Sequence, residues 1–315
     1  MTAFGAMTTE EALPRSSPGS REKVERTYSA GGRAVVFVVA VVSVLMSAAA
    51  PLNADDERVG RGKYLIHAGG CMTCHTEEGE DAVPFSGGRA IESPFGTFYA
   101  PNITPDEKTG IGSWSDEDFV QALWEGINPE GEHYFPAFPF TSYTGVSRDD
   151  LLAMKAFLFS IEPIEKANKE HDLPFMMSSR HAAGLWKARY FEAGRFASDP
   201  AQSEEWNRGA YLVRHLGHCG ECHTPRNRLG ALQDTHHLRG NSDGPDSEDI
   251  PNITADPADG IGDWSVKDLE YFLDIGMLPD GDFVGGSMSS VIDDNTSHLT
   301  RADRVAIAIY LKSLK

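Results

Sequence analysis

CMTCH at residues 71–75 and CGECH at residues 219–223 are two copies of one pentapeptide pattern, Cys-x-x-Cys-His. Two thiols on one short helical turn can add to the two vinyl groups of a haem, and the imidazole that follows can then bind the iron. The pattern therefore predicts two covalently bound haem c groups. The attachment residues would be Cys71, Cys74, Cys219 and Cys222, and the axial iron ligands His75 and His223.

All four cysteines of the chain lie within these pentapeptides. None is left for a disulfide or a catalytic thiol. Two Cys-x-x-Cys pairs can also form a zinc site, but a zinc knuckle does not require a histidine directly after each pair. The sequence therefore favours haem attachment over a haem-free zinc module, and a covalent haem stain would distinguish the two.

An apolar run of 17 residues, AVVFVVAVVSVLMSAAA at 34–50, follows Arg26 and Arg33. The run is short for a spanning helix, and its basic flank and Ala-rich end are typical of a signal peptide. Residues 1–54 are thus expected to be a polar extension plus a signal peptide cleaved near Ala54, which would make the protein periplasmic. The alternative is an uncleaved anchor on the outer face of the cytoplasmic membrane, which leaves membrane association open.

Acidic residues outnumber basic ones, 47 against 28, for a formal net charge of −19. Nucleic acid and anionic membrane surfaces are therefore unfavourable partners, and no nucleic-acid partner is expected. The charge favours a protein partner with a basic docking patch. Acidity also helps to keep an exported protein soluble, which is an equally good explanation for most of these charges.

The rest of the chain consists of two copies of one unit. Three segments recur in the same order: RGKYL at 61–65 as RGAYL at 208–212, PNIT at 101–104 and 251–254, and GIG-x-WS at 110–115 and 260–265. A repeat of this length indicates two domains, not a solenoid. We expect domains at residues 56–161 and 203–315, joined by a linker at 162–202.

Helix signals also fall in the same order in both copies. Capping pairs precede the middle and last apolar segments of each copy: Ser115 with Asp118, Ser147 with Asp150, Ser265 with Asp268, and Thr300 with Asp303. Each copy should open with a helix that leads into the pentapeptide and close with an amphipathic helix. No period-two strand pattern appears, so the predicted fold class is all-α, with long loops around the haem.

Glycines in the two opening helices suggest how the helices pack. Gly62 and Gly209 each lie inside a predicted helix, where glycine costs about 1 kcal/mol relative to alanine. A packing reason is therefore expected. The closing helices would cross there at close range, through Phe157 in the first copy and Tyr310 in the second.

The pentapeptides and the repeated PNIT and GIG-x-WS segments, with HYFPAFPFTSYT at 133–144 and FVGGSMSSV at 283–291, resemble a known family. It comprises the multihaem cytochrome c subunits of bacterial alcohol, gluconate and aldehyde dehydrogenases. The resemblance covers nearly everything from about residue 56 to 315. It implies two tandem cytochrome c domains and an electron carrier, not an enzyme. The carrier would take electrons from an exported dehydrogenase subunit and pass them to a protein or quinone acceptor. Members usually carry three haem motifs, whereas this chain has two.

A methionine opposite the histidine raises the reduction potential of a haem iron relative to two histidines. Met288 lies 24 residues after Trp264, where the family places this ligand. The resemblance thus implies Met288 as an axial ligand of the second haem, with Met277 as the weaker alternative. The second haem should then have the higher potential, so that electrons enter at the first domain and leave from the second.

The same count after Trp114 falls on Phe138, which cannot bind iron. Either another residue supplies the sixth ligand of the first haem, or that iron is five-coordinate or water-bound. Met176 or Met177 is the first candidate for this sixth ligand. The further candidates are His133, Met154, His171 and His181.

Other repeated polar and aromatic residues have two interpretations each. Asn102 with Asn252, and Trp114 with Trp264, would donate hydrogen bonds to buried haem propionates, or the Asn would cap a turn and the Trp fill a pocket wall. Arg226 would pair with a propionate or lie in solvent.

The predicted function is therefore that of a dihaem electron-transfer cytochrome. The alternative is a dihaem enzyme, of the peroxidase or thiosulfate-oxidising type, with the first haem open to substrate. Phe138 supports that alternative, because it cannot supply the sixth iron ligand. Against it, no cluster of acid, base or sulfur ligand converges near the loop of Phe138.

Overall fold

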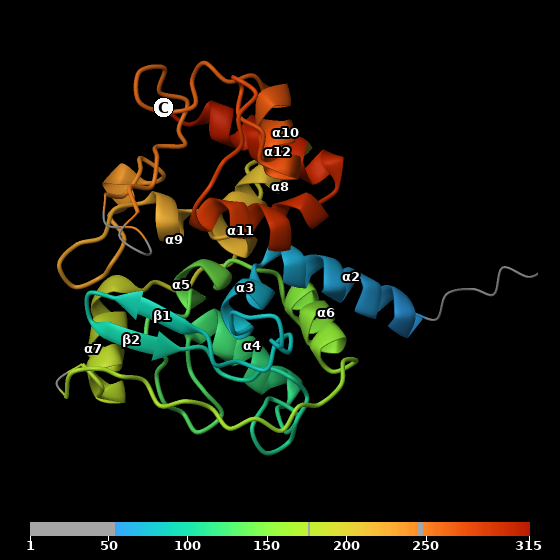
Figure 1. Cartoon of the computed structure of the whole chain (residues 1–315), viewed down its shortest axis with the longest axis vertical. Coiled ribbons are helices and arrows are strands. Elements are labelled where there is room, and N and C mark those ends of the chain that lie inside the picture. The colour runs from blue at the N-terminus through green and yellow to red at the C-terminus, as the bar shows by residue number, and fades with distance from the viewer. Residues whose placement is uncertain (1–53, 176, 243, 245–247) are drawn as a thin grey trace, which may run out of the picture. The chain divides into compact units, whose positions relative to one another are not determined.

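The computed structural model describes residues 54–175, 177–242, 244 and 248–315 (Figure 1). The predicted signal peptide or anchor and Met176 lie outside these residues. The elements of the first copy and of the segment after it are α2 (Ala54–Ala68), α3 (Cys71–His75), β1 (Ala90–Ser93), β2 (Gly96–Tyr99), α4 (Asp116–Glu125), α5 (Phe140–Tyr143), α6 (Arg148–Leu158) and α7 (Arg180–Tyr190). Those of the second copy are α8 (Glu204–Tyr211), η1 (Leu212–Leu216), α9 (Gly220–His223), η2 (Asp234–His236), α10 (Val266–Ile275), α11 (Ser287–Asp294), η4 (Thr296–His298) and α12 (Arg301–Ser313).

The opening and closing helices of each copy cross at the predicted glycines. A Cβ at Gly62 would lie 1.9 Å from the carbonyl oxygen of Ala153 in α6, and one at Gly209 would lie 2.0 Å from that of Ala306 in α12. The Cβ atoms of the predicted aromatic residues, Phe157 and Tyr310, lie next to the same points, at 2.9 and 2.8 Å. The close crossing of α2 with α6 and of α8 with α12 is confirmed.

The predicted helix starts are confirmed as well. Ser115 and Ser265 form reciprocal capping boxes with Asp118 and Asp268 at the starts of α4 and α10. The side chains of Ser147 and Thr300 accept from the backbone N–H groups of Asp150 and Asp303 at the starts of α6 and α12. These four caps satisfy backbone donors that would otherwise have no partner at a helix start.

The structure is mostly helical, but the prediction of an all-α fold is wrong at one point. Strands β1 and β2 pair as a short antiparallel hairpin. The turn is closed by Ser93, whose hydroxyl donates to the carbonyl oxygen of Gly96 and accepts from the N–H of Phe95. Strands of four residues carry too little alternation to be recognised in a sequence.

The segment expected to be a linker packs along the first copy. Asp172 exchanges backbone hydrogen bonds with Thr97 of β2, 2.9 Å each, and so extends the hairpin. Lys166 forms an ion pair with Glu77, two residues after the first pentapeptide. Helix α7 also lies within this segment (Figure 1).

The two copies share one apolar core. A single cluster of buried side chains runs from Leu65 and Ile66 in α2 to Tyr310 and Leu311 in α12. The described residues from Ala54 onward accordingly form one unit by their contacts.

One variable residue of each pentapeptide contacts the other copy. The hydroxyl of Thr73 lies 3.3 Å from the carboxylate of Asp294, at the end of α11. The carboxylate of Glu221 accepts from the hydroxyls of Thr141 and Ser142 in α5, at 3.1 and 2.9 Å. The two attachment helices therefore both lie at the boundary between the copies.

Within the part of the chain that the structure describes, no helix is both long enough and apolar enough to cross a membrane.

Candidate functional site

The two pentapeptides form short helices, α3 and α9 with the residue before it. One helical turn places cysteines three residues apart on the same side, and the histidine follows directly. All four cysteines are free of disulfide bonds. Burial raises the pKa of the Cys71 and Cys219 thiols to about 12, so both stay protonated at neutral pH. The local geometry is that which two thioether bonds to one flat group require.

Both pentapeptide histidines are held in the same way by a repeated proline carbonyl. Nδ1 of His75 donates to the carbonyl oxygen of Pro101 at 2.7 Å, and Nδ1 of His223 donates to that of Pro251 at 2.8 Å. A carbonyl only accepts, so the proton sits on Nδ1 and the lone pair of Nε2 stays available for a metal. Burial lowers the pKa of both histidines, which favours the neutral imidazole that metal binding requires. This role of the PNIT segments is not apparent from the sequence.

Residues Cys71, Cys74 and His75 line a cavity of about 400 Å³. Its walls are mainly apolar and come from the hairpin, α4, the 134–143 loop and α6. Trp114 forms part of the wall, as the packing interpretation of this residue predicts. A mainly apolar cavity with one free imidazole and two thiols at its edge fits a c-type haem.

A shared zinc site has no support in this geometry. Among the residues that the structure describes, which include all four cysteines, no group of three or more His, Cys, Asp or Glu side chains is placed to hold a metal ion.

Asn102 caps a turn, as one of its two interpretations predicts. Its Oδ1 accepts from the backbone N–H and the hydroxyl of Thr104, and its Nδ2 donates to the carbonyl oxygen of Ile164 at 2.7 Å. Asn252 accepts in the same way from Thr254. Both donor hydrogens of the Asn102 amide have protein acceptors, the second being Thr109, so they are not free for a propionate.

Arg226 is partly buried and pairs with a carboxylate of the chain itself. Its guanidinium donates to the Glu221 carboxylate at 2.5 Å and to the carbonyl oxygen of Gly230 at 2.8 Å. It therefore braces the second pentapeptide.

Phe138 lines the cavity of the first haem site, where the count from Trp114 places it. Its ring packs edge-on against Tyr134 and at a tilt against Tyr143, with centroids 5.5 and 5.8 Å apart. The side chain at this position is thus aromatic and has no atom that binds iron.

Of the candidates for the sixth ligand of the first haem, Met154 and His171 line the cavity. Met177 is 42% exposed and does not line it, and neither do His133 and His181. Nδ1 of His171 accepts from the N–H of Tyr99 at 3.1 Å, so in the neutral ring the proton sits on Nε2. In this state His171 is a hydrogen-bond donor, not an iron ligand.

Met288 is the second residue of α11, partly buried. Helix α11 follows the left-handed Gly286 and packs against α10. The weaker candidate, Met277, pairs with Phe283 through a backbone bridge just after α10.

Sequence reasoning missed all but one of the residues that reach the first cavity from outside the first copy. His171 was a candidate, but Asn168, Lys169 and Arg180 of the expected linker and His218 of the second copy were not. The one sequence signal is at His218, since the residue before the first cysteine is Gly70 in one copy and a histidine in the other.

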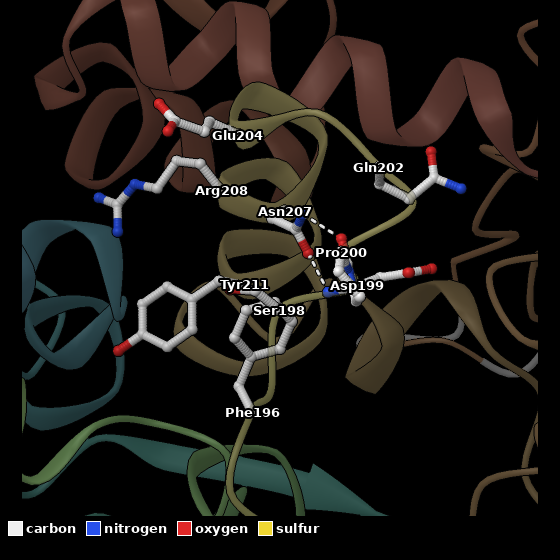
Figure 2. Close-up of a pocket in the computed structure, with 9 residues that line it drawn as sticks. All are labelled: Phe196, Ser198, Asp199, Pro200, Gln202, Glu204, Asn207, Arg208 and Tyr211. Carbon is white, nitrogen blue, oxygen red and sulfur yellow. Dashed lines mark hydrogen bonds between the residues drawn. The ribbon is translucent and has the colours of Figure 1, made fainter.

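A second hollow, of about 530 Å³, lies where the linker meets α8 (Figure 2). None of the pentapeptide residues lines it. Asn207 spans it, accepting from the N–H of Asp199 at 2.6 Å and donating to the carbonyl oxygen of Asp199 at 2.9 Å. These two bonds join the end of the expected linker to α8. They explain why the hollow is lined by the polar residue Asn207.

No protein-family model matches the chain. It is similar to a protein of Cereibacter sphaeroides named diheme cytochrome c-type, with 40% identity over 89% of this chain and 96% of that protein. It is 38% identical to the gluconate 2-dehydrogenase cytochrome c subunit of Pantoea cypripedii, over 89% of this chain and 64% of the relative. It is 37% identical to the fructose dehydrogenase cytochrome subunit of Gluconobacter japonicus, over 92% and 60%. The chain thus spans less than two thirds of these two dehydrogenase subunits.

Proposed function

The chain belongs to the family of dihaem c-type cytochromes and dehydrogenase cytochrome c subunits, and from this premise we propose that it carries electrons from an exported dehydrogenase to a respiratory acceptor. Two haem c groups would be attached, at Cys71 with Cys74 and at Cys219 with Cys222. The observation that carries the proposal is the repeated geometry of His75 and His223, each fixed by a proline carbonyl with Nε2 left free.

When bound, the haem groups supply reversible one-electron couples. The residues of the chain set the conditions for those couples. The carbonyl of Pro101 orients His75 and makes its imidazole a stronger ligand, and Pro251 does the same for His223. The apolar lining of the first cavity excludes water, which disfavours the more highly charged state of the iron.

The names of the relatives support a dehydrogenase as the electron donor, since two of them are cytochrome subunits of gluconate and fructose dehydrogenases. The strong negative charge of the chain supports a protein partner with a basic docking surface. The acceptor would be another protein or a quinone, and the location periplasmic or on the outer face of the cytoplasmic membrane. With Met288 as ligand, the second haem has the higher potential and is the exit site.

The second candidate function is a dihaem enzyme of the peroxidase or thiosulfate-oxidising type. Phe138 in the first cavity is the observation that favours it, because it leaves no ligand at the position expected for a methionine. The family favours the carrier, since the dehydrogenase relatives are cytochrome subunits.

The proposed function is tested first by haem content. A haem stain on a denaturing gel and a pyridine haemochrome assay should find two covalently bound haem c groups per chain. Replacing Cys71 and Cys74 together by alanine should remove one, and replacing Cys219 and Cys222 should remove the other. A protein without covalent haem would contradict the proposal.

The electron donor is tested in extracts of cells that produce the protein. Gluconate, fructose and ethanol are added in turn to the oxidised extract, and a reduced-minus-oxidised spectrum of the tagged protein is recorded. Reduction by one of them identifies the class of dehydrogenase. A purified protein that instead consumes peroxide or thiosulfate with turnover would favour the enzyme.

A further inference from the structure

His218 directly precedes the attachment residue Cys219, yet it lines the cavity beside Cys71, Cys74 and His75. Of the described residues that line this cavity, His218 alone comes from the second copy. The residue next to one haem attachment site thus forms part of the wall of the other haem site.

The backbone of His218 adopts an unfavourable conformation. Its φ is +38°, in the left-handed region that side chains with a Cβ rarely adopt. The equivalent residue of the first copy is Gly70, with φ +63°, where this conformation is free of strain. The same turn therefore precedes both pentapeptides, and only the second copy places a side chain on it. A strained backbone of this kind persists only where the surrounding structure holds the residue in place.

The imidazole of His218 is fixed between the two attachment segments. Its Nε2 donates to the carbonyl oxygen of Gly69, two residues before Cys71, at 3.2 Å. The same oxygen accepts from the hydroxyl of Tyr143 at 2.7 Å. The Tyr143 ring packs edge-on against the imidazole, with centroids 5.4 Å apart and planes at 85°. The side chain is thus held by two contacts, and the Tyr143 hydroxyl fixes the carbonyl to which it binds.

At Gly70 a matching side chain would meet a close neighbour. A Cβ there would lie 3.1 Å from the amide nitrogen of Asn295, which comes from the second copy. At this pair of turns, both His218 and Asn295 reach from the second copy to the first.

We propose that the His218 side chain forms the path by which electrons pass between the two haem groups. The path from the thioether sulfur of Cys219 to the imidazole of His218 consists of covalent bonds only, and the imidazole borders the first haem cavity. Electrons tunnel more readily along covalent bonds than across a gap of equal length. With both groups bound, one electron would pass from the ferrous iron held at His75 to the ferric iron held at His223, and no bond would form or break. The inference rests on the proposed attachment of two haem groups.

The test measures electron exchange within the dihaem protein. The oxidised protein is partly reduced by a laser flash, and the first-order equilibration between the two haem groups is followed by absorbance. His218→Gly installs the residue that the first copy has at this turn, so it relieves strain and is expected to fold. His218→Asn tolerates the left-handed backbone with a shorter side chain. Both variants should slow equilibration by about tenfold, because each removes the imidazole that links Cys219 to the first cavity.

The matched control is His181→Ala, an exposed histidine on α7 that does not line the cavity, and it should retain the original rate. Midpoint potentials of each variant are titrated, and the rates are corrected for driving force. An unchanged corrected rate in His218→Gly and His218→Asn, each with two haem groups, would overturn the proposed path. Haem content is measured before the flash, so a failure of the proposed function is seen separately as fewer than two haem groups in the unmodified protein.

Discussion

The phenol of Tyr64 donates a hydrogen bond to the carboxylate of Asp303, 2.6 Å away, and so ties the first helix of one copy to the last helix of the other. Tyr211 binds Asp150 at the same distance in the opposite direction. Each carboxylate also pairs with an arginine of its own copy, Arg208 for Asp303 and Arg61 for Asp150. Every aspartate of this set is therefore bound by both copies.

Removing one of these phenol hydroxyls should destabilise the protein. Burial alone would raise the pKa of Asp303, but its bonds to Arg208 and Tyr64 outweigh burial and lower it. Tyr64→Phe leaves the carboxylate one donor short, and we expect the free energy of unfolding to fall by about 1–3 kcal/mol. Urea unfolding followed by circular dichroism measures this change. Tyr271→Phe, on an exposed ring, is the control, and equal stability of the two variants would contradict the prediction.

The glycine crossings predict opposite effects for two neighbouring alanine substitutions in α2. Gly62→Ala places a Cβ 1.9 Å from a backbone oxygen of α6, so the helices must move apart, at a cost of about 1–3 kcal/mol or more. Gly60→Ala meets no atom within 4 Å and should instead stabilise the protein by up to about 1 kcal/mol. Thermal unfolding of the two variants should shift in opposite directions. A Gly62→Ala protein as stable as the original would show that the helices are not in contact there.

We expect the first haem to bind carbon monoxide, because Phe138 cannot occupy the sixth coordination position. Its ring lines the cavity and cannot bind iron, so we expect about half of the ferrous haem to respond in a carbon monoxide difference spectrum. Phe138→Met places a thioether at this position and should abolish the response. Phe138→Leu, which also has no iron-binding atom, should retain it. If the unmodified protein shows no response, another residue supplies the sixth ligand.

If Met288 is the axial ligand of the second haem, its removal should change the reduction potential of that haem. Met288→Ala should lower the higher of the two midpoint potentials and open a new carbon monoxide site, because a methionine ligand raises the potential. Met277→Ala is the control and should leave both midpoint potentials in place. A redox titration in which only Met277→Ala changes the higher potential would reassign the ligand.

We expect the protein to lose stability in mild acid because of the buried His215. Burial lowers its pKa in the folded protein, and nearby Arg214 and His237 lower it further, against the raising effect of its bond to the Ser142 carbonyl. The unfolded chain, with a pKa of about 6.5, then takes up the proton first. The free energy of unfolding should thus fall as the pH drops from about 7 towards the lower, folded pKa.

His215→Gln keeps a hydrogen-bond donor without the titrating ring, so its stability should depend less on pH in this range. His236→Gln, at an exposed position, serves as the control. Chemical unfolding at a series of pH values measures both, and a curve for His215→Gln as steep as the original would exclude His215 as the source.

The parts of the fold that were predictable depend on neighbouring residues in the sequence. The capping pairs such as Ser115 with Asp118, and the glycines that allow close crossing, are local signals, and the structure confirms them. The β1–β2 hairpin was missed because its strands have four residues each and gain their order from pairing with Asp172, far along the chain.

The same distinction holds for the candidate site. The pentapeptides are contiguous, so the hypothesis of haem attachment could be formed from the sequence alone, and the count from Trp114 led to Phe138, which lines the cavity. The proline carbonyls that fix His75 and His223 are backbone groups more than twenty residues away, and no side-chain pattern marks them. His218 enters the first cavity through the packing of the two copies, which no single copy specifies.

The wall of the first cavity has a consequence for how the protein matures. The chain is made from its N-terminus, so the first pentapeptide appears long before Arg180 of the expected linker and His218 of the second copy, which complete its cavity. Until these residues are in place, one side of the cavity wall is missing. The first copy therefore cannot form its complete site alone.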